Sequence, residues 1–171
     1  DQISRQLQLA FMVELLPDPN NRVTVDPRYR DALGNPRPVI SYGLSDYTLD
    51  GIAYSRRLSR QIFQRLGVED HTAYDPLDYG YVSHKGEGYT VRGGNHWAGT
   101  HIMGTGAKDS VVDGAQRSWD HENLYLAGAG SMPTTGTSNT TLTLSALAFL
   151  TAERIRAELD QDRSPATIAA D

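Results

Sequence analysis

A histidine and an asparagine that lie 43 positions apart are the residues of this sequence best suited to act together in chemistry. His96 lies in a segment dense in glycine, where the backbone can closely approach a ligand, and imidazole can take up a proton near neutral pH. Asn139 precedes apolar residues at helical spacing, and its amide can donate a hydrogen bond without titrating. Each residue also has an ordinary interpretation, His96 as a surface or buried histidine and Asn139 as the N-cap of a helix.

Generic motifs offer weaker alternatives. Ser131 follows an apolar stretch, but its neighbours lack the Gly-x-Ser-x-Gly pattern of a hydrolase nucleophile. His96 and His101 lack an acidic third metal ligand at a convincing spacing, so no metal site is predicted, although one stays a minor alternative. The segment 128–133 lacks the third glycine of a dinucleotide-binding motif.

The first half of the chain is predicted to form short strands and one helix. Strands are expected over residues 7–16, 21–26 and 38–42, with a turn over 31–36, and they need material from elsewhere to complete their sheet. A helix begins at Ser45 or Asp46 and ends before Gly67. We interpret four arginines on this helix as a solvated face: Arg56, Arg57, Arg60 and Arg65.

The second half is predicted to support the two candidate residues. Residues 71–94 form a long Tyr-rich loop, which is either functional or a surface excursion. A short strand or turn over 110–113 and a buried strand over 123–127 follow. A long helix from about 139 to 159 carries apolar residues at helical spacing, and the tail after it is polar.

Composition places the chain among soluble folded proteins. Of its 171 residues, 39% are apolar and 22% charged, and the net charge of −5 argues against disorder and against a nucleic-acid partner. No apolar run approaches the about 20 residues that span a bilayer, and the absence of cysteine excludes disulfides. The compartment is open, with a soluble cytoplasmic location slightly favoured. Because the chain begins at Asp1 without a methionine or a signal peptide, we expect a piece of a longer protein.

The two candidate residues also stand within a series of linked motifs. The series comprises Glu14-Leu15-Leu16-Pro17, Asn21-Arg22-Val23, His96-x-x-Gly99-Thr100, Ser110-Val111-Val112-Asp113, Asn123-Leu124-Tyr125-Leu126, Met132-Pro133 and Asn139-Thr140-Thr141-Leu142-Thr143. In this order, over residues 10–159, it resembles the C-terminal part of the glucose–methanol–choline (GMC) oxidoreductases, which are FAD-dependent. Within that family the motifs are most similar to those of pyranose oxidases and related sugar dehydrogenases.

The resemblance implies an α/β (α+β) fold that is part of a larger flavoprotein. Residues 1–94 would belong mainly to the substrate-binding domain, giving strands and a helix to its mixed sheet. Residues 95–160 would form the active-site portion of the FAD domain, with a strand and the long C-terminal helix of a Rossmann-like fold, and 161–171 a polar tail. The N-terminal portion of the same enzyme, carrying the dinucleotide-binding motif, would be the partner of this chain.

The resemblance also implies roles for individual residues. His96 would accept the proton of a sugar hydroxyl and Asn139 would hold the same oxygen, so both are expected to be catalytic and to bind substrate. FAD would be contacted from the turn and the helix start, by Gly128, Ala129, Gly130, Asn139, Thr140 and Thr141. Many members have Asp at the position of Ala129, so only a backbone contact is expected there.

The implied activity is oxidation of a secondary alcohol of a sugar to a ketone. The proton leaves to a base, a hydride passes to flavin N5, and O2 or another acceptor reoxidises the flavin. The alternatives are the flavin subunit of a cytochrome- or quinone-linked sugar dehydrogenase and a non-catalytic binding module. No nucleic acid or membrane span is expected, and a homo-oligomer stays open. On its own the chain is expected neither to bind FAD tightly nor to fold well, and the 71–94 loop is a candidate lid over the sugar.

Overall fold

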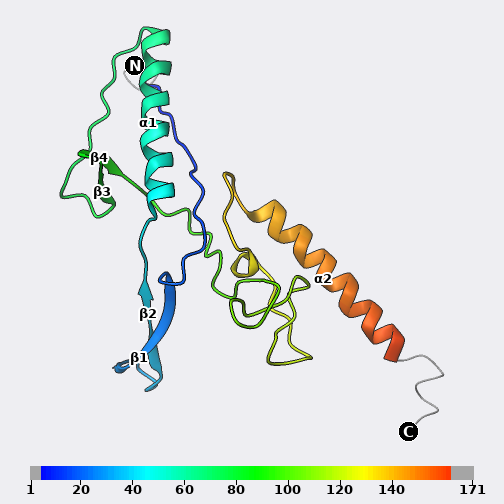
Figure 1. The fold of residues 1–171 in the computed structure, drawn as a ribbon. Coiled ribbons are helices and arrows are strands. Elements are labelled where there is room, and N and C mark those ends of the chain that lie inside the picture. The colour runs from blue at the N-terminus through cyan, green and yellow to red at the C-terminus, as the bar shows by residue number, and fades with distance from the viewer. Residues whose placement is uncertain (1–4, 163–171) are drawn as a thin grey trace.

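A computed structural model describes residues 5–162, in which short strands and two long helices are joined by extended loops (Figure 1). The elements in chain order are β1 (Arg22–Arg30), β2 (Pro36–Ser41), α1 (Asp46–Leu66), β3 (Tyr81–His84), β4 (Glu87–Thr90), the 3-10 turn η2 (Ala129–Ser131) and α2 (Thr141–Asp162). The fold is of mixed α and β class, as predicted. Of the predicted tail 161–171, the first two residues belong to α2 and the rest lie outside the described residues.

Strands β1 and β2 form an antiparallel hairpin that projects away from both helices (Figure 1). Asp31 closes the turn, because its Oδ1 accepts hydrogen bonds of 2.9 Å from two backbone amides further along. The strands predicted over 21–26 and 38–42 and the turn between them are confirmed. The described residues leave several apolar side chains of this hairpin more than half exposed: Val23, Val25, Tyr29, Leu33 and Ile40.

The strand predicted over residues 7–16 is wrong, because this segment joins no sheet. It runs beside α1 (Figure 1), where Val13 packs so closely that a Cβ on Gly51 would lie 2.6 Å from its Cγ1. Thr48 Oγ1 donates a hydrogen bond of 3.0 Å to the backbone carbonyl of Glu14. The segment therefore packs against a helix and not against a neighbouring strand. Alternation of apolar residues does not reveal whether a strand or a helix covers them.

Helix α1 begins and ends where the sequence predicts. Ser45 Oγ accepts a hydrogen bond of 3.4 Å from the amide of Thr48, and Gly67 ends the helix in the left-handed conformation at φ 65°. The solvated-face interpretation holds for the exposed Arg57, Arg60 and Arg65 but is wrong for Arg56. The Arg56 side chain is 9% exposed and lies 2.7 Å from Asp70, so it anchors the chain that leaves the helix.

The expected loop over residues 71–94 contains the antiparallel hairpin β3–β4. Lys85 and Gly86 form its two-residue turn with positive φ values of 50° and 82°, the backbone that a tight hairpin requires. The strands are only four residues long. Tyr, Gly and His in such short runs show little periodicity, which is why the sequence did not indicate them.

Residues 95–140 hold little regular structure. The buried strand predicted over 123–127 is wrong: Tyr125 makes one isolated bridge, to Arg117, and Leu124 is 39% exposed. Among the described residues no second strand lies beside this segment to form a ladder. The segment 110–113, expected as a short strand or turn, forms isolated bridges through the fully buried Val112.

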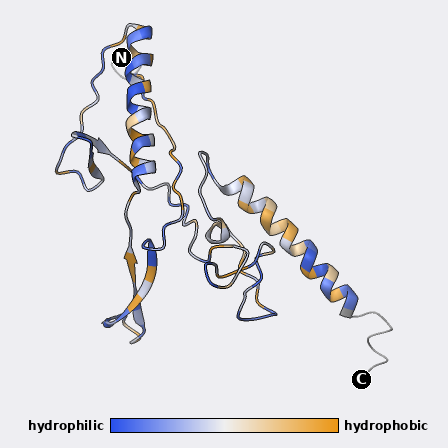
Figure 2. Ribbon diagram, viewed as in Figure 1, coloured by the Kyte–Doolittle hydropathy of each residue, from blue (hydrophilic) through white to orange (hydrophobic). Residues whose placement is uncertain are grey.

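Helix α2 confirms the predicted final helix, although it begins at Thr141 and continues to Asp162. The carbonyl of Thr140 accepts the first hydrogen bond, 2.9 Å from the amide of Leu144. Thr151 faces inward and is buried, whereas Leu142, Phe149 and Leu150 are 83%, 73% and 62% exposed on a helix rich in apolar residues (Figure 2). Neither helix within residues 5–162 is long and apolar enough to cross a bilayer.

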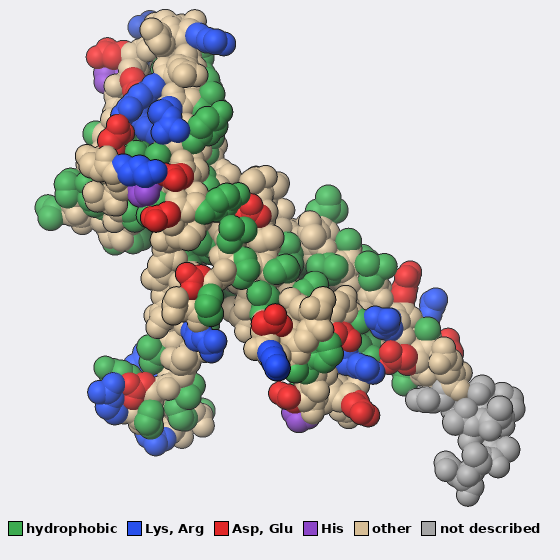
Figure 3. Space-filling model, in the orientation of Figure 1, with side chains coloured by type: hydrophobic (Ala, Val, Ile, Leu, Met, Phe, Trp, Pro, Cys, Tyr) green, Lys and Arg blue, Asp and Glu red, His purple; other side chains and the backbone are tan. Residues whose placement is uncertain are grey.

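The described chain buries few apolar side chains and exposes many (Figure 3). The buried ones are Ala53, Phe63, Tyr89, Val112 and Met132. Exposed apolar surface on this scale is typical of an interface, since soluble monomers seldom leave large apolar patches uncovered.

Candidate active site

The structure brings His96 and Asn139 together. Nε2 of His96 lies 3.2 Å from Oδ1 of Asn139, across 43 positions of sequence. The half-buried histidine comes from the loop after β4, and the exposed asparagine stands just before α2. Because Asn139 Oδ1 makes this contact, it is turned away from the helix and does not act as a cap. Thr140 occupies the N-cap position, and its backbone carbonyl accepts the hydrogen bond from the amide of Leu144.

The backbone on either side of His96 is in an uncommon conformation. Asn95 and Trp97 both have positive φ, 56° and 52°. Asparagine adopts this left-handed region comparatively often, but a bulky residue seldom does. Such backbone is found preferentially at functional sites, where surrounding contacts hold it in place. The imidazole that faces Asn139 is thus carried by a sharply turned loop.

A glycine turn (residues 128–131) packs against the segment that follows His96. The amide of His101 donates a hydrogen bond of 3.1 Å to the carbonyl of Gly130. Gly128 has φ 111°, a conformation that favours glycine. The glycine turn and the loop that carries His96 are therefore tied together through their backbones.

The remaining residues predicted to contact the cofactor lie at the start of α2 and in the glycine turn. Thr140 is buried and Thr141 is the first residue of the helix. First-turn amides have no acceptor inside their own helix, and the dipole makes that end positive. Within the described residues, no hydrogen bond joins Gly128, Ala129 or Gly130 to the helix start, and the two parts are connected along the chain by 132–138.

Ser131 is not placed as a nucleophile. Its side chain is fully buried, and its Oγ donates to the carbonyl of Gly128 at 2.8 Å and accepts from Nε2 of Gln116 at 2.5 Å. A hydrolase serine must be accessible and lie beside a base, so the structure argues against the hydrolase alternative. Over residues 5–162, no three His, Asp or Glu side chains are grouped to hold a metal ion.

Glu14 reaches the segment that leads to Asn139, which the sequence did not indicate. Its Oε1 accepts a hydrogen bond from Thr134 Oγ1 at 2.8 Å, and its Oε2 accepts one from the hydroxyl of Tyr47 at 3.0 Å. That second bond raises the pKa of Tyr47. The carboxylate of Glu14 thus links α1 to the loop before Asn139. The only signal in the sequence is a single charge within an apolar stretch.

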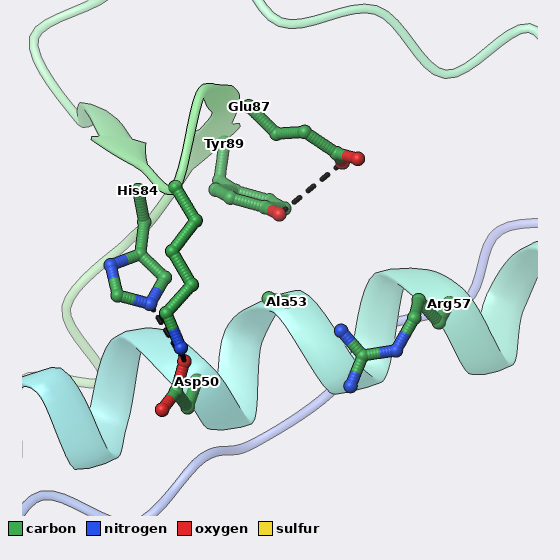
Figure 4. Close-up of a pocket in the computed structure, with 7 residues that line it drawn as sticks. Asp50, Ala53, Arg57, His84, Glu87 and Tyr89 are labelled. Carbon is green, nitrogen blue, oxygen red and sulfur yellow. Dashed lines mark hydrogen bonds and ion pairs between the residues drawn. The ribbon is translucent and has the colours of Figure 1, made fainter.

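A cavity of about 380 Å³ lies between α1 and the β3–β4 hairpin (Figure 4), and neither His96 nor Asn139 lines it. Three of its lining residues form one cluster: Lys85 Nζ and His84 Nε2 lie 2.6 and 2.7 Å from Oδ1 of Asp50. These hydrogen bonds, that of Lys85 first, lower the pKa of Asp50. Because His84 is buried in this contact, the cluster attaches the hairpin to α1.

Known proteins match this chain over most of its length. The family model of the GMC oxidoreductases matches residues 17–148, which include both His96 and Asn139. The chain is 38% identical over 148 residues to the fructose dehydrogenase large subunit of Gluconobacter japonicus, covering 86% of this chain and 25% of that protein.

Two further relatives match a similar share of this chain. The chain is 29% identical over 154 residues to paromamine 6'-oxidase of Streptomyces fradiae, covering 90% of this chain and 26% of that protein. It is 24% identical over 147 residues to the gluconate 2-dehydrogenase flavoprotein of Pantoea cypripedii, with coverage of 85% and 23%. The chain thus spans about a quarter of the length of the curated relatives it matches.

Proposed function

This chain belongs to the GMC oxidoreductases, and we propose that it forms the C-terminal part of an FAD-dependent enzyme that oxidises a secondary hydroxyl group of a sugar. The observation that carries the proposal is the 3.2 Å contact between Nε2 of His96 and Oδ1 of Asn139, which pairs a base with an amide. The names of the relatives, among them a fructose dehydrogenase and a gluconate dehydrogenase, support a sugar or sugar-like substrate.

In this proposal His96 accepts the hydroxyl proton at Nε2. Because Asn139 Oδ1 can only accept, Nε2 carries the ring hydrogen in the free protein, so substrate binds to the tautomer whose hydrogen is on Nδ1 and whose Nε2 is free to accept. Asn139 turns its amide nitrogen toward the same substrate oxygen and donates a hydrogen bond to it. The two side chains contact each other at 3.2 Å in the free protein, so a hydroxyl placed between them replaces one hydrogen bond with two. Because the amide does not titrate, it orients the substrate at any pH.

The residues present fit FAD at two places. A Cβ on Gly128 would meet no atom within 4 Å, so the backbone there is bare toward open space. The positive end of α2, at Asn139, Thr140 and Thr141, suits an anionic edge of a flavin. We assign backbone contacts in the glycine turn to Gly128, Ala129 and Gly130. Bound FAD would supply the hydride acceptor at its N5 position.

We assign residues 1–94 mainly to the substrate-binding domain and 95–160 to the active-site portion of the FAD domain. The N-terminal portion of the enzyme, with its dinucleotide-binding motif, would cover the exposed apolar faces of the β1–β2 hairpin and α2. Two observations support this arrangement. Those faces are without cover from the described residues, and the relatives are about four times as long as the stretch that matches.

Two electron acceptors are candidates. Similarity to a fructose dehydrogenase large subunit and a gluconate 2-dehydrogenase flavoprotein favours a dehydrogenase that passes electrons to a quinone or a cytochrome. Similarity to paromamine 6'-oxidase favours O2.

Measurements on the full-length enzyme test these proposals one after another. Flavin absorbance near 450 nm after purification is expected, and its absence would favour a non-catalytic binding module. Anaerobic mixing with fructose, glucose or gluconate should bleach that absorbance, and NMR of the product should show a ketone. Peroxide release in air then identifies an oxidase, whereas turnover only with an added quinone or cytochrome identifies a dehydrogenase.

A further inference from the structure

A buried glutamine connects α2 to the glycine turn. Gln116 is 1% exposed and is the largest fully buried side chain of the described residues. Its Oε1 accepts a hydrogen bond from Thr151 Oγ1 at 2.6 Å, and its Nε2 donates one to Ser131 Oγ at 2.5 Å. Ser131 Oγ in turn donates to the carbonyl of Gly128 at 2.8 Å. Thr151, Gln116, Ser131 and Gly128 therefore form one continuous series of three hydrogen bonds.

The direction of these bonds is set by the chemistry of the groups. A hydroxyl has a single hydrogen, and Thr151 Oγ1 has two acceptors within reach, Oε1 of Gln116 at 2.6 Å and the carbonyl of Ala115 at 3.2 Å; the shorter contact, to Gln116, takes the hydrogen. The amide nitrogen of Gln116 then donates to Ser131, which leaves the hydrogen of Ser131 for Gly128. Ser131 and Thr151 are 0% and 5% exposed, so water does not compete with the series. A hydrogen-bonded polar series in a dry core favours one arrangement of the groups it joins.

The backbone of Gln116 adds a second link to the same place. The amide of Leu126 donates a hydrogen bond of 2.8 Å to the carbonyl of Gln116. Gln116 therefore holds the chain on both sides of Gly128, through Leu126 before it and Ser131 after it. Thr151 lies ten residues into α2, about 15 Å along a rigid helix from Thr141.

We propose that Gln116 is a positioning residue for the cofactor site, fixing the glycine turn relative to α2 and thereby relative to Asn139. This inference rests on the proposed function, because it takes the glycine turn and the start of α2 as the two parts that hold the flavin. Within the described residues, no hydrogen bond joins those two parts directly. The buried series through Gln116 sets their separation.

Gln116→Met in the full-length enzyme removes both polar atoms at nearly constant volume. Ser131 keeps the carbonyl of Gly128 as its acceptor, and Thr151 has the carbonyl of Ala115 at 3.2 Å, so each buried hydroxyl retains a partner. We expect the Kd for FAD to rise by roughly five- to tenfold, the factor that corresponds to one lost buried hydrogen bond. In the FAD-free protein, the turn amides of Ser131 and Met132 should exchange hydrogen faster.

Two further variants complete the experiment. Thr151→Val removes only the α2 end of the series and should raise the Kd in the same direction by a smaller factor, whether or not Gln116→Met folds. Ser59→Ala is the matched control, because Ser59 is 6% exposed and donates to the carbonyl of Arg56 within α1. It should lower Tm without changing the Kd for FAD or the exchange of the turn amides.

The outcomes separate the two proposals. A raised Kd together with faster exchange at Ser131 and Met132 supports the role of Gln116. If wild type binds FAD and the Gln116 and Thr151 variants lower Tm with unchanged Kd and exchange, Gln116 is a core residue only and this proposal is overturned. A full-length wild type that binds no FAD overturns the proposed function, and the positioning role with it.

Discussion

Gly94 lies directly against the imidazole of His96: a Cβ at position 94 would stand 3.0 Å from Cε1 and 3.1 Å from Nδ1 of the ring. A methyl group there would push the ring by a few tenths of an ångström, because such contacts are shorter than ordinary van der Waals separation. The same ring presents Nε2 to Asn139 at 3.2 Å. The imidazole is therefore held between a bare backbone on one side and the asparagine on the other.

Gly94→Ala should slow flavin reduction by sugar roughly tenfold, because small displacements of a catalytic group cost rate steeply. Gly93→Ala is the matched control, since a Cβ at position 93 would meet no atom within 4 Å. Stopped-flow absorbance at saturating sugar measures both variants, and FAD content should equal that of wild type in each. Equal reduction rates in the two variants would show that Gly94 does not support the ring.

His96→Ala and Asn139→Ala should each slow flavin reduction by about 10² or more, the scale of general-base catalysis. Because we propose that both residues act on one substrate oxygen, the double variant should lose less than the product of the two single effects. FAD binding should change little in His96→Ala. Reduction by sugar at an undiminished rate in His96→Ala would remove this histidine from the mechanism.

Glu14→Ala should lower kcat about tenfold with a smaller change in KM, because the loop that leads to Asn139 loses its anchor at Thr134. Glu14→Gln should restore most of the rate, since its amide oxygen can still accept from Thr134 at the 2.8 Å contact. Glu69→Ala removes an exposed carboxylate as a control and should leave kcat unchanged. If Glu14→Gln is as slow as Glu14→Ala, Glu14 does not act by holding Thr134 and the loop that leads to Asn139 in position.

The elements predicted correctly are those with local signals. Ser45 and Gly67 mark the ends of α1 through bonds within four residues, and Asp31 closes its turn through neighbouring amides. The periodicity of α2 is likewise a property of the helix itself. The pairing of His96 with Asn139 came from the resemblance of linked motifs, because no spacing rule relates positions 43 apart.

The features that were missed depend on partners far along the chain. Residues 7–16 look like a strand until α1 is seen to cover them, and 123–127 has no neighbouring strand among the described residues. The contact of Glu14 with Thr134 spans 120 positions. Gln116 is polar, so its hydropathy predicts a position on the surface, yet its side chain is buried. Its burial is explained by the two buried hydroxyl groups to which it is hydrogen-bonded, and these lie far along the chain.

The ion pair of Asp70 with Arg56 should make the stability of the full-length protein fall at low pH. Hydrogen bonds from Arg56 and then Thr72 lower the pKa of Asp70 from 3.8 to about 2. Because the folded-state pKa lies below that of the unfolded chain, this contribution is present above about pH 4 and is lost as the pH falls toward 2. Asp70→Asn should therefore lower Tm at pH 7 and flatten the fall of Tm between pH 4 and 2.

Asp26→Asn is the matched control for the Asp70 variant. The Arg28 partner of Asp26 is 80% exposed, whereas the Arg56 partner of Asp70 is 9% exposed. Pairs in contact with solvent contribute little, so Asp26→Asn should leave Tm nearly unchanged. Calorimetry across this pH range compares the two, and equal Tm shifts would contradict the assignment.

The 171-residue chain by itself should neither unfold cooperatively nor retain FAD. Burial of apolar surface is the main favourable term in folding, about 25 cal/mol per Å², and it must offset the entropy lost by the ordered chain. Leu142 and Phe149 are instead 83% and 73% exposed. We expect a broad thermal transition by circular dichroism and binding of a hydrophobic dye. One sharp calorimetric transition with FAD retained would show that the chain is self-sufficient.

Phe149→Glu locates the cause of that instability. In the full-length enzyme, where we expect the N-terminal portion to cover α2, this change should cost about 3 kcal/mol or more, the scale of removing a buried phenylalanine. In the isolated chain the side chain is 73% exposed, so the same change should have little effect on the transition. Glu153→Gln, at an exposed polar position of the same helix, should be neutral in both. If Phe149→Glu is neutral in the full-length enzyme as well, this face of α2 is free, and the missing cover must lie over the β1–β2 hairpin instead.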